Sequence, residues 1–258
     1  MHGSSSTWSG SGGPPRLVPE RRRIAIVPAY REERAIADVV TEIRAAGLDL
    51  DVVVVDDGSS DGTAAAAHAA GAAVVRLPFN LGIGGAVQTG FKYALEHGYG
   101  IAVRLDGDGQ HDPAELPKLL EPLLAGEADI VIGSRFADGT AEYRPPLGRR
   151  LGIGFFARIV SLLVGQRVTD TTSGFQALNR KGIRLFAADY PHDYPEVEAT
   201  VMVVKHQLRL LEVPVRMRER EHGRSSITAL RSLYYVVKVL LALFIGLFRR
   251  RVLPLEEA

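Results

Sequence analysis

The chain has 258 residues, of which 46% are hydrophobic and 24% charged, with a net charge of +1 and no cysteine. The near-zero net charge argues against a dedicated nucleic-acid-binding protein, which would carry a clear basic excess. The lack of cysteine excludes disulfide scaffolds, thiolate metal sites and thiol nucleophiles, and is compatible with a reducing cytosol. The ordinary hydrophobic fraction is typical of a globular protein.

The predicted elements alternate between strands and helices from residue 21 onward. Residues 1–20 are rich in Ser, Gly and Pro, which predicts a disordered arm or a remnant of recombinant expression. Short apolar runs predict buried strands at Ile24–Pro28, Val52–Val55, Val74–Leu77 and Ile101–Leu105. Helix signals lie between them, at Glu32–Ala46, Ser60–Ala70 and Gly85–His97. This alternation predicts an α/β fold with a mostly parallel sheet and helices on both faces.

Polar or glycine residues follow each of the four predicted strands. In chain order they are Tyr30 and Glu32, Asp56 and Asp57, Asn80 and Gly82, and Asp106 and Asp108. Open parallel sheets bind ligands at the carboxyl ends of their strands. The four segments together therefore predict a single binding site.

The sequence Asp-Gly-Asp-Gly-Gln-His at 106–111 is the most informative of these segments. Asp106 and Asp108 are two residues apart in an extended segment, so their side chains point to the same side. Two close carboxylates repel each other unless a cation lies between them, and their oxygens suit Mg²⁺ or Mn²⁺ held together with a substrate diphosphate. Gln110 offers a third oxygen ligand. The alternative is an acidic turn whose aspartates cap a helix that begins near Asp112 and Pro113.

Two further segments leave a structural and a functional interpretation open. In Asp56–Thr63, Ser60 or Asp61 can cap a helix and Gly58 can form a turn, or one aspartate can accept hydrogen bonds from a base or a ribose. In Asn80–Ala86, the glycines can cradle a phosphate or can form a tight turn with close helix packing.

These motifs, in this order, resemble glycosyltransferase family 2, whose members have the GT-A fold. The resemblance rests on Val27–Glu32, Val55–Thr63, Asn80-x-Gly82-x-Gly84, Asp106–Pro113 and Gly133–Arg135. Thr172–Phe175 and Arg220-x-x-Gly223-x-Ser225 are similar to the branch typified by dolichyl-phosphate mannose synthase and the bacterial polyprenyl-phosphate glycosyltransferases. The resemblance implies a single GT-A domain at residues 21–226. Two positions depart from the pattern, with Arg31 where Asn is more usual and Ser226 where that branch usually has Lys.

The resemblance also implies roles for individual residues. The implied nucleotide-sugar-binding residues are Pro28, Tyr30, Glu32, Val55, Asp57, Asp106, Gly107, Asp108 and Arg135. The implied metal ligands for Mg²⁺ or Mn²⁺ are Asp106, Asp108 and Gln110, and the implied contacts to the acceptor phosphate are Arg149 and Arg220. Asp106, Asp108, Arg135 and Arg220 form the implied catalytic set. The implied donor is a sugar linked to UDP or GDP.

The residues near this site favour an anionic acceptor. A hydroxyl acceptor must lose its proton to a positioned carboxylate, whereas a lipid phosphate is already an anion. Arginines are plentiful, and the nearest acidic candidates for a base are Asp170, Glu196 and Glu198. We therefore expect inverting transfer of a hexose to polyprenyl phosphate. The alternatives are transfer to a soluble hydroxyl compound, such as a glycan or a natural product, and a non-catalytic nucleotide-sugar-binding membrane scaffold. A nucleotidyltransferase would need a basic Gly-rich loop, which Pro28–Glu32 lacks.

The most apolar segment is Leu230–Phe248, which Lys238 interrupts and Arg249–Arg251 follow. Its uninterrupted part is shorter than the ~20 residues that span a bilayer. Tyrosines at one end and arginines at the other are typical of a helix in the membrane interface. We expect residues 227–258 to form such an amphipathic helix and tail, with Leu230–Arg251 on the inner face of the cell membrane and the protein peripheral in the cytoplasm. The alternatives are an amphipathic helix that packs on the protein's own core or on a twin subunit and, in third place, a helix that spans the membrane. A separate small membrane protein and a second copy of the chain, in a homo-oligomer, are further candidate partners.

Overall fold

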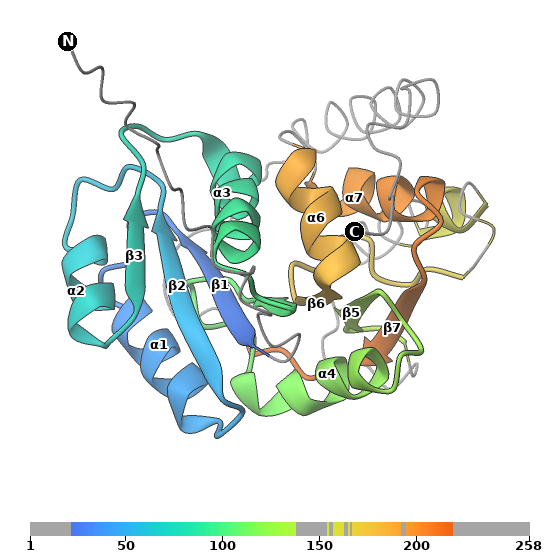
Figure 1. The fold of residues 1–258 in the computed structure, drawn as a ribbon, viewed down its shortest axis with the longest axis horizontal. Coiled ribbons are helices and arrows are strands. Elements are labelled where there is room, and N and C mark those ends of the chain that lie inside the picture. The colour runs from blue at the N-terminus through green and yellow to red at the C-terminus, as the bar shows by residue number, and fades with distance from the viewer. Residues whose placement is uncertain are drawn as a thin grey trace, which may run out of the picture.

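A seven-stranded sheet forms the centre of the protein (Figure 1). The computed structural model describes residues 22–137, 154, 157–162, 165, 167–191 and 195–218. Across the sheet the strands lie in the order β3 (Ala73–Arg76), β2 (Leu50–Asp56), β1 (Arg23–Ala29), β4 (Ile101–Arg104), β6 (Gln176–Asn179), β5 (Ile130–Ser134) and β7 (Leu210–Pro214). β6 is antiparallel to both of its neighbours, and the other pairs are parallel. The predicted mostly parallel sheet is confirmed.

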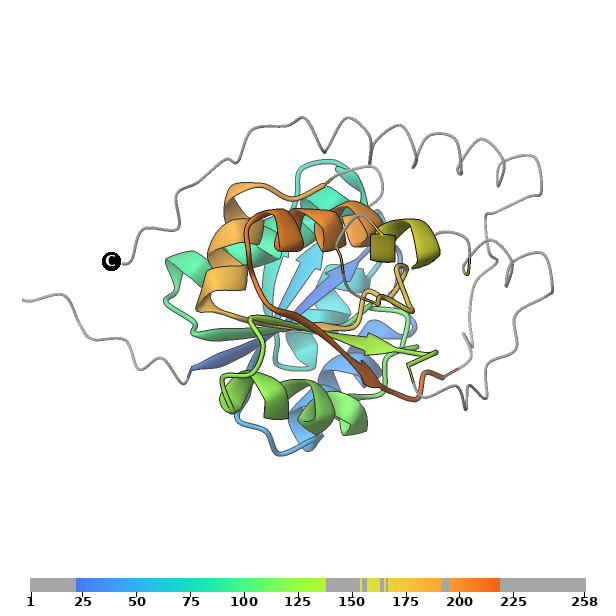
Figure 2. The same ribbon diagram turned by 90° about the vertical axis from the view of Figure 1, so that its right-hand side faces the viewer.

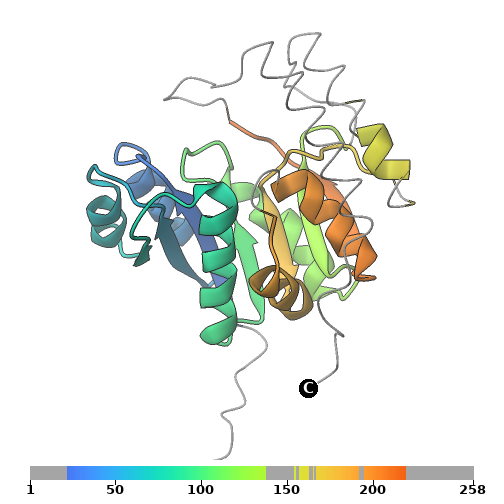
Figure 3. The same cartoon turned by 90° about the horizontal axis from the view of Figure 1, so that it is seen from above.

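Helices cover both faces of the sheet, as Figures 2 and 3 show. On one face lie α1 (Ile36–Ala45), α2 (Thr63–Ala69) and α4 (Leu116–Leu124), and the short 3₁₀ helix η1 (Pro113–Glu115) precedes α4. On the other face lie α3 (Gly82–Glu96), α6 (Arg180–Ala188) and α7 (Pro195–Lys205). Each layer of helices packs its apolar side on the sheet and so forms a separate hydrophobic core.

The apolar runs of the sequence become strands because both faces of the sheet are covered. Val52–Val55 are buried in β2, and β-branched residues suit such a strand. In α1 the residues at helical spacing, Ile36, Val39, Val40 and Ile43, are the buried ones. All four predicted strands and all three predicted helices are present.

The predicted helix boundaries differ from the observed ones at the amino ends. α1 begins at Ile36 rather than Glu32, because the carbonyl of Glu32 accepts hydrogen bonds from the N–H groups of Ala35 and Ile36 and forms a turn. The backbone of Arg31, just before this turn, is left-handed, with a φ of 58°. α2 begins at Thr63 rather than Ser60, and α3 begins at Gly82 rather than Gly85.

Within the residues that the structure describes, there is no helix of the length and apolar character needed to cross a membrane. The expected arm at residues 1–20 and the expected interfacial helix at Leu230–Arg251 lie outside the described residues. The same holds for Arg149 and Arg220.

Candidate functional site

The carboxyl ends of β1, β2 and β4 meet at one edge of the sheet. Pro28 pairs with Val55 in register, and the N–H of Asp57 donates to the carbonyl of Ala29 at 2.9 Å. A Cβ on Gly107 would lie 3.1 Å from the carbonyl oxygen of Pro28, so the loop after β4 packs directly against β1. The structure therefore brings the predicted donor-binding segments together. Pro28 and Val55 are buried within this edge.

The loops after β1 and β2 are joined by side-chain hydrogen bonds. The N–H of Arg31 donates to Oγ of Ser59 at 3.0 Å, and the N–H of Glu32 donates to Oγ1 of Thr63 at 2.9 Å. Tyr30 is 42% exposed, and the guanidinium of Arg31 lies 5.2 Å from the centre of its ring. The rim of the site thus presents an aromatic ring to solvent beside a cation.

Both aspartates at the end of β2 have structural partners. The carboxylate of Asp57 accepts hydrogen bonds from the N–H groups of Leu81 and Gly82 at 2.7 and 2.9 Å, at the start of α3. Oδ1 of Asp56 accepts from the N–H of Ser59 at 3.1 Å. The structural interpretation of the segment that follows β2 is correct in part. Gly58 forms a turn with a φ of 70°, and Asp61 accepts a hydrogen bond from the N–H of Thr63 at the start of α2, although the N-cap residue is Gly62. Asp57 caps α3, which is not the helix that follows it in the chain. Its role toward a nucleoside stays a prediction.

Asp106 and Asp108 do not cap the helix that follows them, so the alternative interpretation of this loop as a capping turn is wrong for these two residues. Asp112 caps η1 instead, because its side chain accepts a hydrogen bond from the N–H of Ala114. Asp106, Asp108 and Gln110 are all partly exposed at the edge of the sheet. Asp108 accepts a hydrogen bond from the N–H of Gln110 at 3.1 Å, which shapes the loop.

Asp106 lies between a buried arginine and a buried histidine. Its Oδ1 is 3.4 Å from Nη2 of Arg104, and its Oδ2 is 3.8 Å from Nε2 of His111. His111 stacks on Phe175, and its Nδ1 accepts a hydrogen bond from the N–H of Asp106 at 3.0 Å. Burial lowers the pKa of His111, with Asp106 acting in the opposite direction. A neutral His111 carries its hydrogen on Nε2, the atom that faces Asp106.

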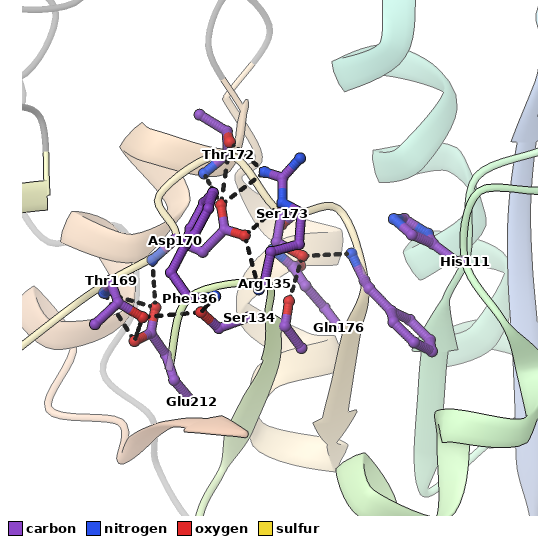
Figure 4. A network of polar contacts seen from close by, with 12 residues as sticks. His111, Ser134, Arg135, Phe136, Thr169, Asp170, Thr172, Ser173, Gln176 and Glu212 are labelled. Atoms are coloured by element: carbon purple, nitrogen blue, oxygen red, sulfur yellow. Dashed lines mark hydrogen bonds and ion pairs between the residues drawn. The ribbon is translucent and has the colours of Figure 1, made fainter. Parts of the chain in front are cut away.

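Arg135 forms a two-pronged ion pair with Asp170 (Figure 4). Its Nε and Nη2 donate to the two carboxylate oxygens of Asp170 at 2.8 Å each, and Nη2 also donates to Oγ1 of Thr172 at 2.7 Å. Burial alone would raise the pKa of Asp170, but the hydrogen bonds and the charge of Arg135 outweigh it and hold this pKa below its usual value. Asp170 is therefore an anion that orients Arg135.

Glu212 of β7 holds the loop that carries Asp170 (Figure 4). It accepts hydrogen bonds from the N–H groups of Thr169 and Asp170 and from the hydroxyl of Thr169 at 2.8–3.0 Å. The hydroxyl groups of Thr169 and Ser134 lie 2.8 Å apart, which ties the loop to the end of β5. Two segments distant from Arg135 in sequence, the loop at 169–172 and β7, thus fix its position.

The segment after β7 returns to the 106–111 loop. His111 and Met217 form an antiparallel bridge, and the N–H of Arg218 donates to the carbonyl of Gln110 at 2.9 Å. The side chain of Arg218 pairs with Asp112 at 3.0 Å. The chain that leads to Arg220 therefore starts beside the predicted metal ligands.

The sequence profile described as Glycosyl transferase family 2 matches residues 24–186, which is more than half of the chain. The chain belongs to glycosyltransferase family 2. It is similar to the polyprenol monophosphomannose synthase of Mycolicibacterium smegmatis, with 34% identity over 85% of this chain and 86% of the relative. It is also similar to the undecaprenyl-phosphate mannosyltransferase of Micrococcus luteus, with 33% identity over 80% of this chain and 88% of the relative.

This glycosyltransferase has the GT-A fold. A solved structure of glucosyl-3-phosphoglycerate synthase from Mycobacterium tuberculosis, in complex with Mn²⁺, uridine diphosphate and phosphoglyceric acid, superposes with a TM-score of 0.66. The superposition covers 91% of this chain and 80% of the other, at 24% sequence identity. The likeness at this identity concerns the fold, which agrees with the fold class expected from the sequence.

The oxygen atoms that the glycosyltransferase offers at this loop fit a divalent ion such as Mg²⁺ or Mn²⁺. Asp106, Asp108 and Gln110 offer two carboxylates and one amide oxygen from a single partly exposed loop. Oxygen ligands of this kind suit Mg²⁺ and Mn²⁺. Over the described part of the chain, no cluster of three or more His, Asp or Glu side chains suits a metal ion. Mg²⁺ is usually held by one or two carboxylates together with substrate phosphates, so it does not require such a cluster.

Three residues that shape the site were not predicted from the sequence: Arg104, His111 and Glu212. Arg104 had a detectable signal, because a charged residue interrupts the apolar run Ile101–Leu105. A charge within a buried strand needs partners, and these partners come from elsewhere in the chain. Glu212 had no comparable signal, since its partners Thr169 and Asp170 are more than forty residues away in sequence.

Proposed function

We propose that this glycosyltransferase transfers a hexose, with inversion, from a UDP- or GDP-linked sugar to polyprenyl phosphate, assisted by Mg²⁺ or Mn²⁺. Its relatives support this acceptor class. The two named above are called a polyprenol monophosphomannose synthase and an undecaprenyl-phosphate mannosyltransferase, and each is matched over more than four fifths of its own length.

One observation supports a phosphate as the acceptor: two of the three acidic residues that could act as a general base are paired with arginines. Asp170 is held by Arg135, which keeps its pKa low, and Oε1 of Glu196 accepts a hydrogen bond from Arg104 at 2.9 Å. The lowered pKa of Asp170 makes it a weak base, and the carboxylate of Glu196 is already engaged by Arg104. A phosphate acceptor is already an anion and needs no base, so it suits these pairs better than a hydroxyl does.

A pocket of about 890 Å³ beside the Arg135–Asp170 pair supports an acceptor with a charged head and an apolar chain. Phe136, Leu162 and Val168 contribute apolar surface to its lining, and Arg158 and Arg167 contribute positive charge. Such a lining suits a lipid phosphate, whose head is an anion and whose tail is hydrocarbon.

In this proposal each group of site residues binds a different part of the substrates. Asp106, Asp108 and Gln110 would hold the ion, which neutralises the negative charge that develops on the leaving diphosphate. Tyr30, Glu32 and Asp57, with the buried Pro28 and Val55, form the nucleoside side, and Gly107 lets the loop close on it. Arg135, anchored by Asp170, would bind phosphates of the donor. Arg149 and Arg220, which lie outside the described residues, are assigned to the acceptor phosphate in this proposal.

In this proposal the catalytic domain comprises residues 21–226. The protein lies on the inner face of the cell membrane. Leu230–Arg251 would contact the lipid surface, because the segment is apolar and ends in three arginines. Sedimentation with vesicles of anionic phospholipid tests this. We expect the full chain to sediment with the vesicles, and a chain that ends at residue 226 to stay in the supernatant.

The transfer reaction is tested with the full chain in detergent, undecaprenyl phosphate, Mn²⁺ and a panel of labelled UDP- and GDP-hexoses. We expect label to enter the organic phase only when the lipid phosphate and Mn²⁺ are both present. Asp108→Ala should lower the rate about 100-fold or more, the effect typical of losing one electrostatic contact in an active site. Asp112→Asn is the matched control from the same loop, because Asn also caps helices well, and its rate should stay close to that of the natural chain.

Other outcomes would contradict the proposal. Transfer to a soluble hydroxyl compound in the absence of lipid would establish the alternative acceptor. Binding of nucleotide sugars without transfer to any acceptor would favour the membrane scaffold. An undiminished rate in Asp108→Ala would remove the role assigned to the metal ion.

A further inference from the structure

Arg104 is an arginine buried within the core at the end of β4, 1% exposed. Its N–H groups make contacts with residues of three different segments. Nη1 donates to the hydroxyl of Tyr190 at 3.0 Å, and Nη2 donates to Oε1 of Glu196 at 2.9 Å. Nη2 also lies 3.4 Å from Oδ1 of Asp106. One guanidinium therefore links the loop of the predicted metal ligands to α7 and to the segment that follows α6.

The charges of this cluster depend on each other. Burial opposes the charge on Arg104, but a guanidinium stays charged in proteins, and the carboxylates of Asp106 and Glu196 supply the negative charge beside it. An ionised carboxylate next to a buried cation is held in its orientation, because turning away would remove one of the two negative charges that offset the buried cation. Asp106 is thus held from the interior while its side chain stays 32% exposed on the outer side.

Gly174 keeps the pair close together. A Cβ at this position would lie 2.9 Å from Nη2 of Arg104 and 3.1 Å from Oδ1 of Asp106. The loop that carries Gly174 therefore packs directly on the ion pair, and a larger residue would push the two groups apart. The close packing shows that the loop and the pair fit each other in one arrangement.

We propose that Arg104 is a positioning residue, which holds the carboxylate of Asp106 in the orientation that the divalent ion and the donor diphosphate need, and which joins this carboxylate to Glu196 on α7. The inference rests on the proposed function, since it assigns a supporting role to a residue of the same site. Groups that orient metal ligands from behind are worth about 10–100-fold in metal affinity.

Lys cannot replace Arg in this role. The guanidinium is a planar fork that contacts Tyr190 and Glu196 with separate nitrogens while it faces Asp106, whereas an ammonium is a point charge on a flexible stem. Arg104→Lys therefore keeps the charge but loses the fixed geometry. A purely structural cluster would lose stability in this variant without any change in metal dependence.

The experiment measures thermal stabilisation of the full chain by UDP and by GDP as a function of Mn²⁺ concentration, without lipid acceptor. A ligand that binds only the native state raises the melting temperature, so the shift reports binding without turnover. We expect Arg104→Lys to raise the Mn²⁺ concentration for half of the maximal shift by about tenfold or more. The control is Arg209→Lys, because the guanidinium of Arg209 also depends on its fork shape, in a two-pronged contact with Asp129 at the opposite edge of the sheet. Its Mn²⁺ dependence should equal that of the natural chain.

If Arg104→Lys does not fold, the variant Glu196→Gln tests the same inference. Glu196→Gln keeps the shape of the side chain but removes the charge that holds Nη2 toward α7, so we expect a smaller rise in the Mn²⁺ requirement. An Mn²⁺ dependence equal to that of the natural chain, in Glu196→Gln and in any folded Arg104→Lys, would overturn the inference and leave the proposed function standing. A natural chain without any Mn²⁺-dependent shift would overturn both.

Discussion

Replacing Asp170 by Asn tests how much the ion pair with Arg135 contributes to the fold around the site. The carboxylate accepts hydrogen bonds from the backbone N–H, Nε and Nη2 of Arg135 and from the N–H and hydroxyl of Thr172. An amide would turn an NH₂ group toward one set of these donors and would remove the negative charge that pairs with the guanidinium. Asp170 is only 1% exposed, so water cannot take its place.

The expected cost is about 3–5 kcal/mol, the range for removing one partner of a buried pair. In a domain of this size, 1 kcal/mol corresponds to about 2–4 °C in melting temperature, so Asp170→Asn should lower the melting temperature by about 6–20 °C. Circular dichroism during heating at pH 7 measures this. Asp38→Asn on the exposed side of α1 is the control, with an expected change within about 0.5 kcal/mol. Equal losses in the two variants would refute the reasoning.

The same pair predicts a dependence on pH. The pKa of Asp170 in the folded protein lies below its unfolded value of about 3.9. Its stabilisation is therefore present above about pH 4 and is lost as the pH falls through the folded pKa. The difference in stability between the natural protein and Asp170→Asn should shrink in acid. A difference that stayed constant well below pH 4 would show that the charge of Asp170 is not the cause.

Three further substitutions test the architecture of the site. Gly58→Ala should prevent stable folding, because Gly58 has a φ of 70° and a Cβ would lie 2.7 Å from the carbonyl carbon of Phe79; soluble yield and circular dichroism measure this. Asp57→Ala should lower the free energy of unfolding by about 1–2 kcal/mol in urea titrations, since the start of α3 loses its cap. Gly174→Ala should lower the rate of sugar transfer even at temperatures where the variant is fully folded, because its Cβ would displace Arg104 and Asp106.

The sequence predicted those parts of the fold that depend on local pattern. The apolar runs at Ile24–Pro28 and Val52–Val55 are buried strands, and the spacing of Ile36, Val39 and Ile43 gives the buried side of α1. Both kinds of signal come from neighbouring residues and need no knowledge of distant contacts. The clustering of polar residues at the ends of β1, β2 and β4 followed from the parallel arrangement.

Contacts between distant residues explain what the sequence did not reveal. α3 starts three residues early because its cap, Asp57, lies 24 residues before Leu81. The links from Arg104 to Tyr190 and Glu196 cover 86 and 92 residues. The insertion of the antiparallel β6 between β4 and β5 is also a long-range pairing that no local signal encodes.

The direct pairing of β5 with β6 has a consequence for how such enzymes diversify. β5 ends at Ser134 and β6 begins at Gln176, and the two strands are hydrogen-bonded neighbours although they lie far apart in sequence. Changes in length of the chain between them do not shift the register of the strands, which side-chain burial fixes independently. Insertions and deletions between these two strands can therefore accumulate during evolution while the hydrogen-bonded strands of the sheet keep their geometry.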